Sequence, residues 1–130
     1  MRQLITTLVL LFVTPLAFTQ TSATTFAKIA EVYGNDYSEM YPDAYQFLTR
    51  TLETRVELEY VQNIQADKYT PISQLTLNTK YNPLLSAYDP SQFSVENFNP
   101  LKFMINFTRT DIDQFYWIDN TNYLLIIRRQ

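Results

Sequence analysis

The stretch from Gln114 to Ile127, QFYWIDNTNYLLII, decides the fold of this 130-residue chain. It holds two runs of aromatic and branched apolar residues, Gln114–Ile118 and Tyr123–Ile127, separated by the polar sequence Asp119–Asn122. Such runs favour strands, and a short Asp/Asn-rich link between them is typical of a hairpin. Leu124–Ile127 is apolar on both faces, which predicts a central strand or one covered by helices. The alternative, an exposed apolar edge that favours self-association, stays open.

Further strands are predicted upstream of this hairpin. In Arg55–Tyr60, charged and apolar residues alternate, as in a strand with one buried and one exposed face. Ile72–Leu77 and Leu101–Phe107 are predicted to be strands on the same grounds. Two stretches share the pattern aromatic-Asn-Pro-Leu, Tyr81–Leu84 and Phe98–Leu101. Because Asn-Pro favours turns, both are predicted to be turns that lead into strands.

The first half of the chain shows helical periodicity. Apolar residues in Thr25–Tyr33 recur at helical spacing, and Gly34 follows where a helix ends in the left-handed conformation. Asp36 resembles the first residue of a capping box, and Pro42 suits the first turn of a helix running to Glu53. Helices followed by strands predict an α+β domain, with two or three N-terminal helices packed on one face of a C-terminal antiparallel sheet of about four or five strands.

Residues 1–20 have the pattern of an export signal. A positive start at Met1-Arg2 precedes the apolar run Leu4–Ala17, which is shorter than the about 20 residues that a membrane-spanning helix needs. Small residues after the run predict cleavage near 19/20 or 23/24, and retention as an anchor is the alternative. We therefore expect an exported protein, periplasmic or extracellular, with residues 21–130 forming one domain that has no membrane span.

Composition excludes several kinds of chemistry. The chain has no cysteine, no histidine and one glycine, which excludes disulfides, zinc knuckles, haem ligation, thiol or Ser-His catalysis and glycine-rich nucleotide loops. No cofactor is therefore predicted. The net charge is −3 and the basic residues are scattered, which argues against nucleic acid as a partner.

Carboxylates are the acid–base groups that remain near neutral pH. Glu57 and Glu59 share one face of a predicted strand, about 7 Å apart, a spacing found in glycoside hydrolases. Alternating charge on a strand is also ordinary on a solvated face, and that interpretation is preferred. Asp111, Asp113 and Asp119 are a candidate calcium site, although aspartates equally serve turns through their own backbone.

Tyrosine is the most unusual component of the composition, with ten residues in the chain. Four of them recur every fourth residue: Tyr33, Tyr37, Tyr41 and Tyr45. Rings with polar tips suit interfaces and sugar-stacking platforms, but they also suit the border of a core, which is the preferred interpretation. Tyr69, Tyr81 and Tyr88 lie in an irregular region and are the candidate exposed binding residues.

Phe98-Asn99-Pro100-Leu101, the aromatic run Phe103–Phe107 and the hairpin stretch Tyr116–Leu124 together resemble a group of small exported proteins from Flavobacteria-type bacteria. The resemblance covers the last third of the chain and implies a bacterial source and export, with no activity or catalytic residue to carry over. The sequence thus predicts a non-catalytic binding or interaction domain of the bacterial cell envelope, whose partner is an unknown protein or a surface glycan. The alternatives are a carbohydrate-binding module that uses the exposed tyrosines, and a carboxylate-dependent hydrolase at Glu57 and Glu59.

Overall fold

The computed structural model describes residues 21–130, and it confirms an α+β fold with the helices N-terminal to the sheet. Three helices come first: α1 (Thr21–Tyr33), α2 (Tyr37–Met40) and α3 (Pro42–Arg50). In this part of the chain no helix combines the length and apolar character that crossing a membrane requires. The predicted signal peptide, residues 1–20, lies outside the described residues.

The sheet has four strands in the order β1-β4-β3-β2: β1 (Val56–Tyr60), β2 (Thr70–Pro71), β3 (Gln114–Trp117) and β4 (Tyr123–Ile127). The predicted hairpin is confirmed as β3–β4, with Trp117 opposite Leu124 and Gln114 opposite Ile127. Strand β4 lies between β1 and β3, so it is central, and its residues Leu124–Ile127 are all buried. The alternative of an apolar edge strand at this position is wrong.

The sheet has four strands as predicted and two of its three pairings are antiparallel, but it is mixed, because β2 pairs with β3 in parallel. After β1 the chain crosses from one edge of the sheet to the other and adds Thr70 and Pro71 beside Tyr116 and Trp117. Proline has no N–H to continue the hydrogen-bond ladder, so this edge strand ends after two residues.

Two segments that were predicted to be strands have another backbone conformation. Ile72–Gln74 is a turn of 3₁₀-helix, and within the predicted Ile72–Leu77 strand the pairing is reduced to a single bridge between Leu77 and Phe103. The predicted strand Leu101–Phe107 begins with another 3₁₀ turn, η6 (Pro100–Lys102). Both segments therefore contribute buried side chains without joining the sheet.

The alternation that suggested a strand over 101–107 is real, but its cause is different. Phe103, Ile105 and Phe107 are buried while Met104 is exposed. Beyond the bridge at Phe103, where Met104 N donates to Thr76 O at 2.8 Å, the backbone bonds to itself: Ile105 N donates to Phe103 O at 2.9 Å and Phe107 N donates to Ile105 O at 3.0 Å. Hydrogen bonds between residues i and i+2 form γ-turns, which keep the chain extended and alternate its side chains with no neighbouring strand.

The ends of the helices differ from prediction in part. Gly34 has φ of 96°, and its N–H donates to Ala30 O, so the left-handed helix end is confirmed. The helix begins earlier than the predicted Thr25, because α1 already includes Thr21 and Thr25 is buried inside it. Asp36 precedes α2, but its side chain makes no capping hydrogen bond.

The predicted helix Pro42–Glu53 is interrupted after Arg50. The next residues, Thr51–Arg55, form a single wider π turn that leads directly into β1. The Thr54 hydroxyl donates to Arg50 O at 2.6 Å, a local bond that competes with the regular helix ladder. The π turn places both Thr51 and Arg55 in the interior, at 1% and 4% exposure.

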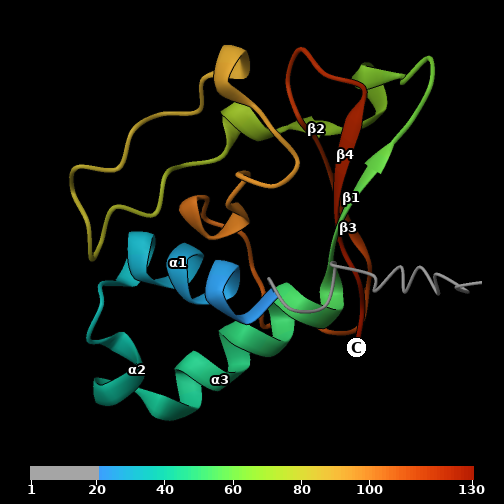
Figure 1. Ribbon diagram of the computed structural model, residues 1–130. Helices are drawn as coiled ribbons and strands as arrows, with labels where there is room; N and C mark the ends of the chain where they lie inside the picture. Colours follow the sequence, from blue (N-terminus) through green and yellow to red (C-terminus); the bar gives the residue numbers. More distant parts are fainter. Residues whose placement is uncertain (1–20) are drawn as a thin grey trace, which may run out of the picture.

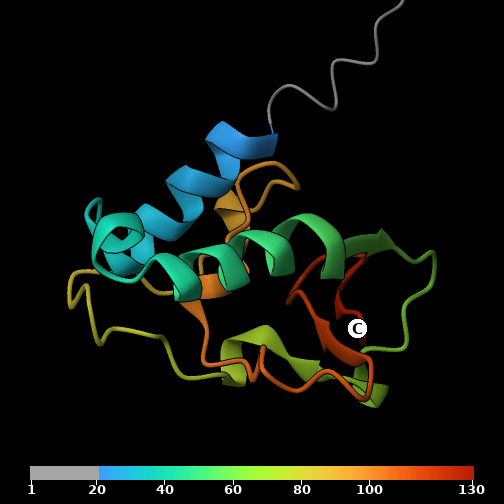
Figure 2. The same cartoon turned by 90° about the horizontal axis from the view of Figure 1, so that it is seen from below.

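Helices α1 and α3 pack against each other, and η6 with the residues after it lies between α1 and the sheet (Figure 1). The core accordingly contains residues from all three parts, among them Ile29 and Val32 of α1, Leu101 of η6 and Leu125 of β4. From below, the segment from about residue 75 to 90 is seen to run from the sheet to the ends of the helices (Figure 2).

Candidate functional site

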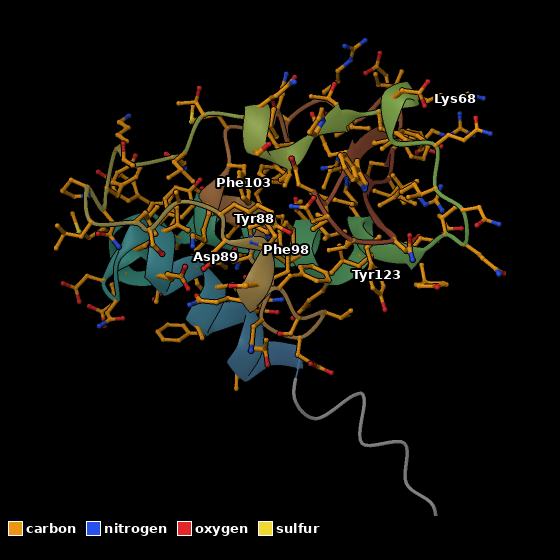
Figure 3. All side chains as sticks on the ribbon, turned by 90° about the horizontal axis from the view of Figure 1, so that it is seen from above. Lys68, Tyr88, Asp89, Phe98, Phe103 and Tyr123 are labelled. Atoms are coloured by element: carbon orange, nitrogen blue, oxygen red, sulfur yellow. The ribbon has the colours of Figure 1, made fainter. Side chains whose placement is uncertain are left out.

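A pocket of about 420 Å³ opens between the end of α1 and the loop that leads into η6. Its residues come from Glu31, from the stretch 86–99, and from Lys102 and Phe103. Figure 3 shows Tyr88, Phe98 and Phe103 gathered together, with Asp89 next to them. The volume falls in the range of small-molecule sites.

The pocket has an aromatic floor. Phe98 and Phe103 stack with ring centroids 5.9 Å apart, and Tyr88 meets Phe103 edge-on at 6.5 Å. Phe93 lies against Phe98 at 5.8 Å and against Tyr123 at 5.5 Å, which links the floor to strand β4. Phe98 and Phe103 belong to the buried core, so the floor is held in place from behind.

Polar groups surround this floor. The exposed side-chain amides of Gln92 and Asn97 line the pocket. Lys102 Nζ lies 3.7 Å from Glu31 Oε1, which places a loose ion pair at the rim. Asp89 Oδ1 accepts from both N and Oγ of Ser91, so Oδ2 is the oxygen left for a ligand donor.

Tyr88 is fixed at one side of the pocket. Its hydroxyl donates to Asp119 O at 3.0 Å, in the turn of the β3–β4 hairpin. Burial, together with the nearby charges of Asp119 and Asp89, raises the pKa of Tyr88 to about 12. Tyr88 is therefore a neutral hydrogen-bonding group through the physiological range.

The loop is attached to α1 by asparagine side chains. Asn99 Oδ1 accepts from Leu101 N at 3.1 Å, and its Nδ2 donates to Lys28 O at 2.8 Å. Asn82 repeats both contacts, accepting from Leu84 N at 3.1 Å and donating to Glu31 O at 2.9 Å. The two aromatic-Asn-Pro-Leu stretches are therefore matching clamps on one helix, and they do not lead into strands.

The three predicted binding tyrosines do not form one platform. Tyr88 is half-buried and lines the pocket, whereas Tyr69 is half-buried beside Phe115, with ring centroids 6.4 Å apart. Tyr81 is exposed and packs with Tyr33 at 5.2 Å. The expectation of a shared exposed set is thus met only by Tyr81.

The three predicted metal-site aspartates are not brought together. Asp111 pairs with Arg109 at 3.2 Å, and Asp113 Oδ1 accepts from Arg129 N at 2.7 Å. Asp119 lies beyond the other end of β3, where it accepts from N and Oγ of Ser73. Within residues 21–130 no group of three acidic side chains is arranged to hold a metal ion. Each aspartate instead fastens a turn or a chain end.

Glu57 and Glu59 are both exposed on β1, as their alternation predicts. Glu57 Oε2 accepts from Arg128 at 3.1 and 3.2 Å, and Arg128 also reaches Asp113 at 3.4 Å. This network connects β1 to the residues before β3 and after β4. It gives Glu57 a structural role on an open sheet face.

Sequence reasoning missed most of the pocket. Phe98 was placed in a turn and Phe103 in a strand, and neither was considered as part of a binding site, although both line the pocket. The repeated aromatic-Asn-Pro-Leu pattern was the available signal, because it marks the two ends of the loop that forms the pocket.

Comparison with protein-family models, with curated proteins and with solved structures finds no match to this chain.

Proposed function

We propose that this chain is a non-catalytic binding domain of the bacterial cell envelope and that its pocket binds a saccharide of one or two sugar rings. The observation that carries the proposal is the combination, in one pocket, of an aromatic floor with exposed amides and a carboxylate at the rim. The envelope location rests on the export pattern of residues 1–20.

A saccharide suits both parts of this pocket. The C–H faces of a sugar ring stack on aromatic rings, and its hydroxyls exchange hydrogen bonds with amides and carboxylates at the edge. Asp89 Oδ2 supplies an acceptor, while the amides of Gln92 and Asn97 supply donors and acceptors. Packing against the core already holds the rings of Tyr88 and Phe103 in place, which lowers the entropy cost of ordering them when a ligand binds.

Binding is favoured over turnover by the roles of the carboxylates at the pocket. Asp89 is engaged with Ser91, and Glu31 is paired with Lys102. Glu57 and Glu59, the pair considered for hydrolysis, lie on β1 and do not line this pocket. No histidine or cysteine occurs in the chain to supply another base or nucleophile.

The test is a glycan array followed by titration calorimetry of the full chain with any glycan that binds. Replacing Gln92 or Asn97 by Ala removes rim amides and is expected to weaken binding about fivefold, the value of one hydrogen bond. The matched control is Gln62→Ala, an exposed amide outside the pocket, which is expected to leave affinity unchanged.

Three results would overturn the proposal. A glycan array that shows no binding at high protein concentration would contradict a saccharide ligand. Equal loss of affinity in Gln62→Ala and Asn97→Ala would show that the ligand binds outside the pocket. Release of new reducing ends from a bound glycan would show that the protein is catalytic.

A further inference from the structure

A second feature, at the end of α1, shares no aromatic residue with the pocket. Four tyrosines form what we call the tyrosine cluster: Tyr33, Tyr37, Tyr41 and Tyr81. Tyr33 and Tyr37 are 4.6 Å apart, Tyr37 and Tyr41 are 5.3 Å apart, and Tyr81 lies 5.2 Å from Tyr33. The cluster thus joins the end of α1, helix α2 and the loop at residue 81.

The outer rings of the tyrosine cluster remain in contact with solvent. Tyr41 is 49% exposed and Tyr81 is 44% exposed, and Met40 beside them is also exposed. Tyr33 and Tyr37 are half-buried beneath them. A group of stacked, partly exposed rings with polar hydroxyl tips is typical of interaction surfaces.

One face of the tyrosine cluster already holds a cation. Lys80 Nζ lies 5.3 Å from the centre of the Tyr81 ring, within the distance at which an ammonium is attracted to an aromatic face. This internal contact shows that a positively charged side chain can pack against a ring face of the cluster.

The surroundings of the tyrosine cluster are acidic. Residues 31–49 contain four carboxylates and no lysine or arginine: Glu31, Asp36, Glu39 and Asp43. All four residues are exposed. Within residues 21–130, Asp36, Glu39 and Asp43 form no ion pair, so their charge is available to a partner.

We propose that the tyrosine cluster is a docking surface for a lysine- or arginine-rich segment of a partner protein. Guanidinium and ammonium groups stack on the ring faces, while the neighbouring carboxylates complement their charge. Net negative charge around the rings disfavours an acidic partner or a nucleic acid by the same electrostatics.

The experiment uses the full chain and fluorescein-labelled peptides that alternate Arg with Ser, or Glu with Ser, followed by fluorescence anisotropy at low salt. The Arg peptide is expected to bind and the Glu peptide is not. Tyr81→Leu, which keeps an apolar side chain but removes the ring, is expected to weaken binding about fivefold. The double variant Asp36→Asn with Glu39→Gln lowers affinity as well and leaves every ring in place.

The matched controls make the same changes elsewhere. Tyr60 and Glu59 are exposed on β1, and Tyr60→Leu with Glu59→Gln is expected to leave binding within about twofold of the parent. Lys80→Met frees the face of Tyr81 and is expected to tighten binding more than Lys68→Met, which removes an equal charge from an exposed site near β2.

Equal effects of the control and cluster variants overturn the proposal, because they indicate general attraction of a cation to an acidic protein. Equal binding of the Arg and Glu peptides, or equal effects of Lys80→Met and Lys68→Met, does the same. A result against the tyrosine cluster leaves the saccharide pocket untouched, since no cluster tyrosine lines it.

Discussion

The β3–β4 hairpin and the segment from Asn78 to Asp113 supply buried residues to the same core, yet they are held by different interactions. In the hairpin, Leu125 and Ile127 belong to β4, a strand that is hydrogen-bonded to a neighbouring strand on each side. In the longer segment, Leu101 and Phe103 are equally buried, but the backbone there makes turns, one bridge and a single bond from Gln130 N to Thr110 O.

Side chains replace the missing ladder in that segment. Asn82 and Asn99 attach it to carbonyls of α1, and Arg55 donates from three nitrogens to the carbonyls of Phe107, Arg109 and Arg128 at 2.7, 2.9 and 2.8 Å. A segment that is attached only at a few residues can bend away from its neighbours in the stretches between those attachments. The pocket lies between two of these points, at residues 86–99, which a continuous strand would have closed.

The largest expected effect comes from removing the Arg55 clamp. Arg55 is only 4% exposed, so Arg55→Met leaves carbonyls in the interior without donors. We expect the free energy of unfolding to fall by about 3–5 kcal/mol. Urea denaturation measures it, and the control Arg50→Met, at an exposed arginine that ends α3, is expected to stay within about 0.5 kcal/mol.

Hydrogen exchange makes the Arg55 experiment a test of the comparison. In Arg55→Met the amides of residues 103–107 are expected to lose more protection than those of β3 and β4. Equal loss in both regions would show that the hairpin and the longer segment unfold as one cooperative unit and are not held independently.

The two asparagines that attach the longer segment to α1 are expected to contribute less to stability than Arg55, and by unequal amounts. Asn99 is 3% exposed and Asn82 is half-buried, with the same pair of hydrogen bonds. Asn99→Ala is therefore expected to cost about 2 kcal/mol of unfolding free energy, and Asn82→Ala about 1 kcal/mol. Asn97→Ala, the exposed pocket variant, serves as the neutral control in the same thermal or urea melts. Equal costs at Asn82 and Asn99 would contradict the role given to burial.

The smallest effect concerns the chain end next to β4. The backbone N–H of Arg129 donates to Asp113 and, with the charges of Arg128 and Arg129, lowers the pKa of that carboxyl below its ordinary value of 3.8. The unfolded state then binds the proton first, so the stabilisation is complete above about pH 5 and is lost as the pH falls through the lowered pKa.

Asp113→Asn removes this dependence. Melting temperatures measured from about pH 6 down to about pH 2.5 are expected to show the parent more stable at the upper end and the two proteins converging at the lower end. A constant difference across the whole range would mean that the hydrogen bond matters and the carboxylate charge does not.

The binding residues were predictable only in part. Tyr81 and Tyr88 follow from tyrosine content and position, and both lie at the proposed sites. Their separation into two surfaces depends on where residues 78–103 run, which Asn82 and Asn99 decide through contacts with α1. The aspartates at 111, 113 and 119 looked like one cluster because they are close in sequence, but β3 separates Asp119 from the other two.

By itself the sequence determined the features that depend on neighbouring residues. These are the end of α1 at Gly34, the start of α3 at Pro42, the β3–β4 hairpin and the burial of every second residue from Phe103 to Phe107. Only the tertiary structure decided the parallel pairing of β2, the π turn that buries Arg55, and the γ-turns of 103–107. The reason is physical: alternation fixes which side chains point inward, but the partner of each backbone N–H and C=O is chosen by segments far away in the chain.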